Sequence, residues 1–234
     1  MTAPDSQPEL SRPWRWLKRL ALAAFVVCLT LWLAHPAILR WIGQGLIYHP
    51  ERVSTHVDAL LVLDGKQGYA RAEEWLAEDS GSSVMLYHRT PSRVVELGVL
   101  PTHYELSRQI VEELHIPADR VTELPGAAEN IEDLLAKAIE LQKQGTHVGL
   151  IMTEWRSALI HELLLRQDAD ESHHPAFVLI EDPEVHASNW WQSRHGVRQV
   201  AMFWSRLLAA RMSDDTYRRE LVTPDDFRRY AIAQ

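Results

Sequence analysis

Asp58-Ala59-Leu60-Leu61-Val62-Leu63 is the stretch that decides the fold, because its apolar run is too short for a helix and too continuous for a surface strand. Such runs are typical of strands buried on both faces of a parallel sheet. Similar short runs at 84–87, 120–124, 148–152 and 177–180 predict four more strands. Segments with helical spacing lie between and after them, at 70–78, 104–114, 128–144, 155–166 and 190–212.

This alternation of strands and helices predicts an α/β domain over residues 57–212. Parallel strands need crossover connections, and helices in those connections cover both faces of the sheet. We therefore expect a Rossmann-like three-layer sandwich with a mostly parallel sheet, preceded by one transmembrane helix.

The transmembrane helix is predicted at 20–39, where LALAAFVVCLTLWLA opens a nearly uniform apolar segment. About 20 residues of helix cross a bilayer. Residues 1–19 form a basic tail, and basic flanks stay cytoplasmic, so the domain is expected on the extracytoplasmic side of a bacterial inner membrane. A cleaved signal peptide and a buried core helix are the alternatives. Residues 40–56 are predicted as a juxtamembrane linker and 213–234 as a C-terminal appendage.

Charge and cysteine content narrow the function. The chain of 234 residues has a formal charge of −8, and residues 41–234 carry −11 because the basic residues gather before them. An acidic domain repels a phosphate backbone, so no nucleic-acid partner is expected. Cys28 is the only cysteine and lies in the apolar segment, which leaves the domain without disulfide or thiolate chemistry.

Candidate site residues follow the strands, because ligands of such sheets bind outside the carboxyl ends of the strands. Many of these residues are cations, which is unexpected in an acidic domain and predicts a cleft for an anionic small molecule or a lipid-linked ligand. The alternative is that each arginine pairs with a neighbouring acid. We expect proton transfer by Glu105 or Asp64. The expected ligand-binding residues are Gly65, Arg71, Arg89, Ser92, Arg93, Asn130, Arg156 and Arg194.

Motifs for bound cofactors and metals are missing. The spacing around Gly65 and Gly68 fits neither a Walker A loop nor a dinucleotide-binding GxGxxG. Leu165 stands where a zinc-binding HExxH motif from His161 would need histidine. His173 and His174 are expected in a solvated loop. We therefore predict no cofactor and no metal.

Several segments together resemble the SanA/ElyC/YdcF group, a family named as a domain of unknown function. The basic tail, the apolar helix, Asp64-Gly65 and Arg71 follow its layout, and Glu105 matches a helix-starting glutamate. LPGAAEN at 124–130, LIMTEWRSA at 150–158 and NWWQSRHGV at 189–197 correspond to further family segments, the last being the most specific. The resemblance covers about 47–212. It implies a Rossmann-like fold and a role in the cell envelope, in peptidoglycan or surface-polysaccharide metabolism.

Departures from the family pattern leave two hypotheses. Tyr87-His88-Arg89 replaces a Ser-Gly-Gly, and Arg156 stands at a family histidine. One hypothesis is an enzyme acting on a phosphorylated envelope precursor, a lipid-linked or nucleotide-linked sugar. The other is a non-catalytic envelope factor that binds a protein partner and regulates assembly.

Overall fold

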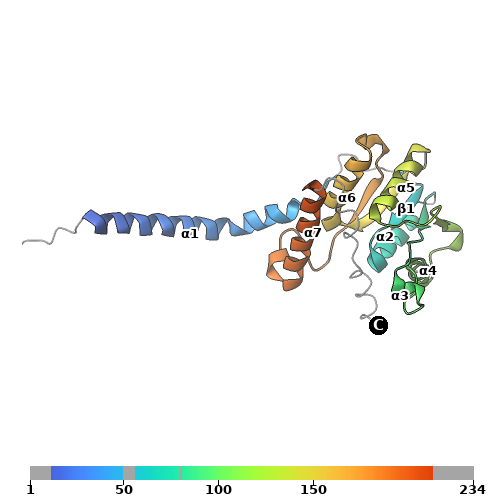
Figure 1. Ribbon diagram of the computed structural model, residues 1–234, viewed down its shortest axis with the longest axis horizontal. Helices are drawn as coiled ribbons and strands as arrows, with labels where there is room; N and C mark the ends of the chain where they lie inside the picture. The colour runs from blue at the N-terminus through green and yellow to red at the C-terminus, as the bar shows by residue number, and fades with distance from the viewer. Residues whose placement is uncertain (1–11, 50–55, 80, 213–234) are drawn as a thin grey trace, which may run out of the picture.

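Five parallel strands form a single sheet in the computed structural model, which describes residues 12–49, 56–79 and 81–212. Their order across the sheet is β3-β2-β1-β4-β5, so the first strand lies at the centre (Figure 1). The strands are β1 (Ala59–Val62), β2 (Ser83–Leu86), β3 (Val121–Glu123), β4 (Val148–Thr153) and β5 (Ala176–Ile180). The predicted sheet and all five predicted strands are confirmed. Residues 1–11 of the predicted tail (1–19) and the predicted appendage at 213–234 lie outside the described residues, and the rest of the tail belongs to helix α1 (Arg12–Gln44).

Strand β1 is buried on both faces, as its continuous apolar sequence predicts. Leu60 pairs with Val84 of β2 on one side and with Gly149 of β4 on the other. Leu60 and Leu61 are both completely buried, and they point to opposite faces of the sheet because side chains alternate along a strand. The centre of the sheet therefore belongs to two separate cores.

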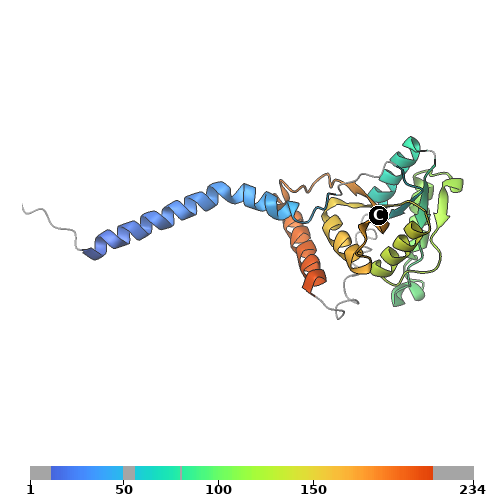
Figure 2. The same cartoon turned by 90° about the horizontal axis from the view of Figure 1, so that it is seen from above.

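Helices cover both faces and complete three layers, as Figures 1 and 2 show. Helices α2 (Gly65–Glu78) and α4 (His103–Glu113) contribute Tyr69 and Val111 to the core that contains Leu60. Helices α5 (Ile131–Lys143) and α6 (Glu154–Gln167) contribute Leu135 and Ile160 to the core that contains Leu61. The predicted Rossmann-like architecture is therefore confirmed for the described residues.

Short elements complete the chain between these helices. Helix α3 (Arg93–Glu96) follows β2, and the 3-10 helices η1 (Ala118–Arg120), η2 (Glu171–His173) and η3 (Trp190–Gln192) lie in loops. Helix α7 (Arg194–Met212) is the last described element. The predicted helix from 190 thus begins as η3 and bends at Ser193, and Gly196 sits so close to the backbone of Trp190 that a Cβ there would clash.

Helix α1 (Arg12–Gln44) extends away from the domain (Figures 1 and 2). A bend of 42° divides it into Trp16–Thr30 and Trp32–Gln44, and neither part is long and apolar enough to cross a membrane by itself. The two parts pass that test together, by length and composition. Phe25 and Leu33, in the predicted transmembrane segment, are 63% and 65% exposed.

The end of α1 packs against the domain, where the sequence predicts a linker from residue 40. The helix continues to Gln44, and Leu46 is buried in a third apolar cluster with Trp155, Trp190 and Phe203. The indole N–H of Trp190 donates to the carbonyl of Leu39 at 2.9 Å. This docking orients α1 relative to the sheet, a result that the sequence pattern did not predict.

Candidate functional site

The centre of the carboxyl edge lies between β1 and β4, where the strand order reverses direction. In open α/β sheets this switch point is where ligands bind. Asp64 follows β1, and its carboxylate accepts hydrogen bonds from the Thr153 N–H and from the Arg156 guanidinium. Arg156 also donates to the Leu63 carbonyl at 3.0 Å. The side chains of Asp64 and Arg156 are 18% and 20% exposed, so this ion pair closes the switch point.

A second polar group lies at the end of β2, and we call it the β2 site: Arg89, His103 and the rings around them. Arg89 forms a parallel bridge with Ala128, and the Ala128 N–H donates to the His88 carbonyl at 2.8 Å. These contacts hold the loop after β2 against the loop after β3. The backbone that carries Arg89 is therefore fixed at the carboxyl edge.

His103 is the first residue of α4 and lies near enough to Arg89 for that charge to act on it. The pKa of His103 is lowered to about 4, first by burial and then by the positive charge of Arg89, while a hydrogen bond with the Tyr87 backbone opposes the shift. The His103 ring lies 4.4 Å from the ring of Tyr87, centroid to centroid. His103 is therefore neutral at pH 7 and adds no second positive charge near Arg89.

An aromatic wall borders the β2 site. The His88 and Tyr104 rings stack with centroids 4.1 Å apart, and the Tyr104 hydroxyl donates to the Glu123 carboxylate. That hydrogen bond is the main reason that the pKa of Tyr104 is raised. The Glu123 carboxylate is therefore bound by Tyr104. Among the described residues, neither Glu123 nor any other carboxylate forms an ion pair with Arg89.

The other predicted site residues lie at separate helix beginnings along the same edge. Glu105 closes a capping box on α4, where its carboxylate accepts from the N–H and hydroxyl of Thr102 at 2.7 and 2.9 Å. These two hydrogen bonds lower the pKa of Glu105. Asn130 caps α5 by accepting from the Asp133 N–H at 2.8 Å. Both side chains therefore support helix ends.

The remaining arginine, glycine and serine candidates lie at the starts or on the surfaces of other helices. Arg71 donates to Glu74 at 2.7 Å on the surface of α2, as the alternative of local pairing expects. Gly65 is the first residue of α2. Ser92 and Arg93 are exposed at the start of α3, and Arg194 is exposed at the start of α7. The structure joins Asp64 with Arg156 and leaves Arg89 and Arg93 available to a ligand.

A pocket of about 380 Å³ opens at the same edge, beyond β4 and β5, and we call it the junction pocket. It is lined by Arg40, Gln44, Glu154, Glu181, His186, Ala187 and Ser188. Arg40 and Gln44 belong to the last turns of α1, so they reach the domain through the docking of that helix. The sequence did not predict that Arg40 and Gln44 line a pocket, because they fall in the predicted linker, whose contacts cannot be read from its residues. His103 was missed because its sequence neighbours give no sign of burial.

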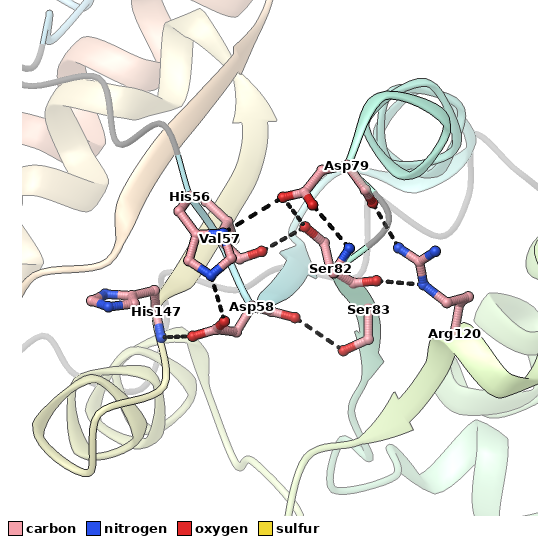
Figure 3. A network of polar contacts seen from close by, with 9 residues as sticks. His56, Val57, Asp58, Asp79, Ser82, Ser83, Arg120 and His147 are labelled. Atoms are coloured by element: carbon pink, nitrogen blue, oxygen red, sulfur yellow. Dashed lines mark hydrogen bonds and ion pairs between the residues drawn. The ribbon is translucent and has the colours of Figure 1, made fainter.

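The opposite, amino edge of the sheet carries another polar network (Figure 3). Ser82 is completely buried, and its hydroxyl donates to the Val57 carbonyl at 2.5 Å and lies 2.9 Å from Asp79. Arg120 donates to the carbonyls of Ser82 and Asp79 at 2.6 and 2.8 Å. Because every one of these groups contacts another part of the chain, the network stabilises strand ends.

The described residues contain no group of three or more His, Cys, Asp or Glu side chains placed to hold a metal ion. No protein-family model matches the chain, and no curated protein matches its sequence. The fold and the local chemistry therefore carry the functional argument.

Proposed function

We propose that this protein is a membrane-anchored, extracytoplasmic protein of the cell envelope that binds an anionic, phosphorylated ligand at the β2 site. The observation that carries the proposal is Arg89, a cation on a fixed backbone at the ligand-binding edge of the sheet, beside a neutral histidine. Desolvated or partly buried cations attract phosphate more strongly than freely solvated ones, and arginine matches phosphate with paired N–H donors. Arg93 lies four residues farther and adds a second positive charge.

Helix α1 supports the membrane part of the proposal. Its apolar side chains are exposed over a long segment, and exposed apolar surface of this extent is typical of contact with another apolar phase. The basic residues of its first turns, Arg12 to Arg19, favour a cytoplasmic N-terminus and an extracytoplasmic domain. The resemblance to the SanA/ElyC/YdcF group supports a ligand from peptidoglycan or surface-polysaccharide metabolism, such as a lipid-linked or nucleotide-linked sugar.

A second candidate function is a non-catalytic envelope factor that binds a protein partner and regulates assembly. The positions of the two carboxylates that could transfer a proton favour it. Asp64 is held by Arg156 and the Thr153 N–H, and Glu105 is held by Thr102. A carboxylate whose oxygens already accept hydrogen bonds in an ion pair or a capping box is poorly placed to take a proton from a ligand.

A ligand titration tests the proposed binding function. Full-length protein in detergent micelles would be titrated with undecaprenyl phosphate and with a nucleotide sugar, and binding would be measured by calorimetry. We expect the Arg89→Ala plus Arg93→Ala variant to bind about tenfold or more weakly, because two charge-assisted contacts are lost. The matched control is Arg108→Ala plus Arg211→Ala, which removes the same charge from exposed ion pairs outside the β2 site.

The titration has a clear negative outcome. If neither ligand binds, or if the two double variants bind equally, the β2 site is not the place of recognition. Turnover of a bound precursor by the purified protein would exclude the non-catalytic candidate. Turnover that persists in Asp64→Asn and Glu105→Gln would show that neither carboxylate takes part in the reaction.

A further inference from the structure

The junction pocket differs from the β2 site in place and in charge. Its walls come from three parts of the chain: the last turns of α1, the first residue of α6 and the loop after β5. This pocket lies beside the outer strand pair β4 and β5, whereas the β2 site follows the second strand on the other side of β1. A ligand in one site therefore does not occupy the other.

The walls of the junction pocket are fixed by hydrogen bonds. The Trp204 indole donates to the Ile42 carbonyl at 3.1 Å, and the Trp155 indole donates to the Val185 carbonyl at 3.1 Å. In the loop after β5, the Asp182 carboxylate accepts the Glu184 and Val185 N–H groups at 2.9 and 3.0 Å. Since these contacts hold both the helix end and the loop, the pocket is formed before a ligand enters, which lowers the entropic cost of binding.

The charges in the pocket are of both signs and do not neutralise one another. Arg40 brings a guanidinium, while Glu154 and Glu181 bring carboxylates. Within the described residues none of these three side chains forms an ion pair. Glu154 is half-buried, and its pKa is raised first by burial and then by the negative charges of Glu181 and Asp182, while His186 opposes the shift. Among the described residues, no cationic side chain forms an ion pair with Glu154 or Glu181, and no carboxylate forms one with Arg40.

A pocket with separated, unpaired charges of opposite sign is complementary to a zwitterion. We infer that the junction pocket binds a small zwitterionic group, an ammonium that contacts Glu154 and Glu181 together with a phosphate that contacts Arg40. An ammonium donates up to three hydrogen bonds, and its positive charge offsets the repulsion between the two carboxylates. A volume of about 380 Å³ is in the range of small-molecule sites. The group is an aminoalkyl phosphate, either free or as the headgroup of a phospholipid.

Phosphoethanolamine is the probe that tests the inference. Full-length protein in detergent micelles would be titrated with phosphoethanolamine, with ethanolamine and with inorganic phosphate. We expect phosphoethanolamine to bind, and each single-charge fragment to bind about tenfold or more weakly, since each loses one charge-assisted contact. A short-chain phosphatidylethanolamine carries the same group on a lipid. Tighter binding of that lipid identifies a headgroup as the source, and tighter binding of the free compound identifies a soluble one; both support the inference.

Matched variants separate this pocket from the β2 site. Arg40→Gln and Glu154→Gln each remove one charge and keep a polar side chain, and each is expected to weaken phosphoethanolamine binding about tenfold or more. These variants are compared in an Arg89→Ala background, so that phosphate binding at the β2 site does not contribute to the measured affinity. Circular dichroism confirms that the variants fold. The inference is overturned if neither form of the probe binds, or if both pocket variants bind as the parent does. Neither result bears on the titration of the β2 site with undecaprenyl phosphate and a nucleotide sugar, so the two proposals fail separately.

Discussion

Arg156 binds the Asp64 carboxylate across the two central strands, at the point where the strand order of the sheet reverses. Asp64 lies just after β1, at the start of α2, and Arg156 lies in the first turn of α6, directly after β4. The same carboxylate accepts the Thr153 N–H, so one side chain ties the end of β1 to the end of β4.

Removal of this pair should cost measurable stability. The Asp64→Ala variant leaves a guanidinium that is 20% exposed without its carboxylate, and we expect a loss of about 2 kcal/mol, the range of charge-assisted hydrogen bonds. Urea unfolding of the full chain, followed by tryptophan fluorescence, measures it. As a control, Arg71→Ala breaks an exposed helical ion pair and should cost about 0.5 kcal/mol or less. Equal losses in the two variants would contradict the assigned role.

The sheet could be predicted from sequence because burial on two faces imposes a continuous apolar run, and each of the five runs became a strand. The contact of Asp64 with Arg156 could not, because 92 residues separate them and the ion pair depends on the strand order. The cation pattern predicted arginines at one edge of the sheet. It could not separate Arg71, which pairs with Glu74, from Arg89, which does not, since local spacing does not reveal which side chains are already neutralised.

The docking of α1 predicts an effect of single indole groups. Trp204→Phe keeps most of the ring and removes the hydrogen bond to the Ile42 carbonyl, and we expect a loss of about 1 kcal/mol in the stability of the docked helix end. Trypsin cleavage after Arg40 measures this local stability, because cleavage requires the helix to open. Trp75→Phe is the control, since its indole N–H is buried without a hydrogen-bond partner. Equal cleavage rates in both variants would show that the helix end is held by packing alone.

The network at the amino edge predicts a large effect at one serine and a small effect at its neighbour. Ser82→Ala removes a buried hydroxyl and leaves the Val57 carbonyl without that donor, so we expect a loss of about 2 kcal/mol. Ser83→Ala removes a hydroxyl that is partly exposed and lies 3.2 Å from the Asp58 carbonyl, and it should cost about 0.5 kcal/mol. Urea unfolding at pH 7 compares the two. A larger loss in the Ser83 variant would be the contrary result.

The same network predicts a change at acidic pH. The Gly81 N–H and then the Ser82 hydroxyl lower the pKa of Asp79 below its ordinary value of 3.8. The stabilisation from this carboxylate is therefore complete above pH 3.8 and is lost as the pH falls toward the lower pKa of the folded protein. In Asp79→Asn that part of the pH dependence should disappear, and urea midpoints measured between pH 5 and pH 2 would show it. A wild-type slope in the variant would count against the assignment.

His103 predicts a separate loss of stability in a higher pH range. Its pKa is about 4 in the folded protein against an ordinary value of 6.5, first because of burial and then because of Arg89. As the pH falls below 6.5, the unfolded chain binds a proton before the folded one does, so stability decreases down to about pH 4 and this contribution is constant below it. His103→Gln cannot ionise and should flatten the curve in that range.

His161, whose pKa is also lowered by burial, contributes in the same direction, so His161→Gln is the matched control. The decisive measurement is the pKa of His103 itself, by NMR titration with and without a bound phosphorylated ligand. An anion on Arg89 cancels the charge that disfavours the imidazolium, and the pKa of His103 should then rise toward its ordinary value. The pKa of His161 should not change. A His103 pKa that stays the same in the presence of a bound ligand would place that ligand away from Arg89.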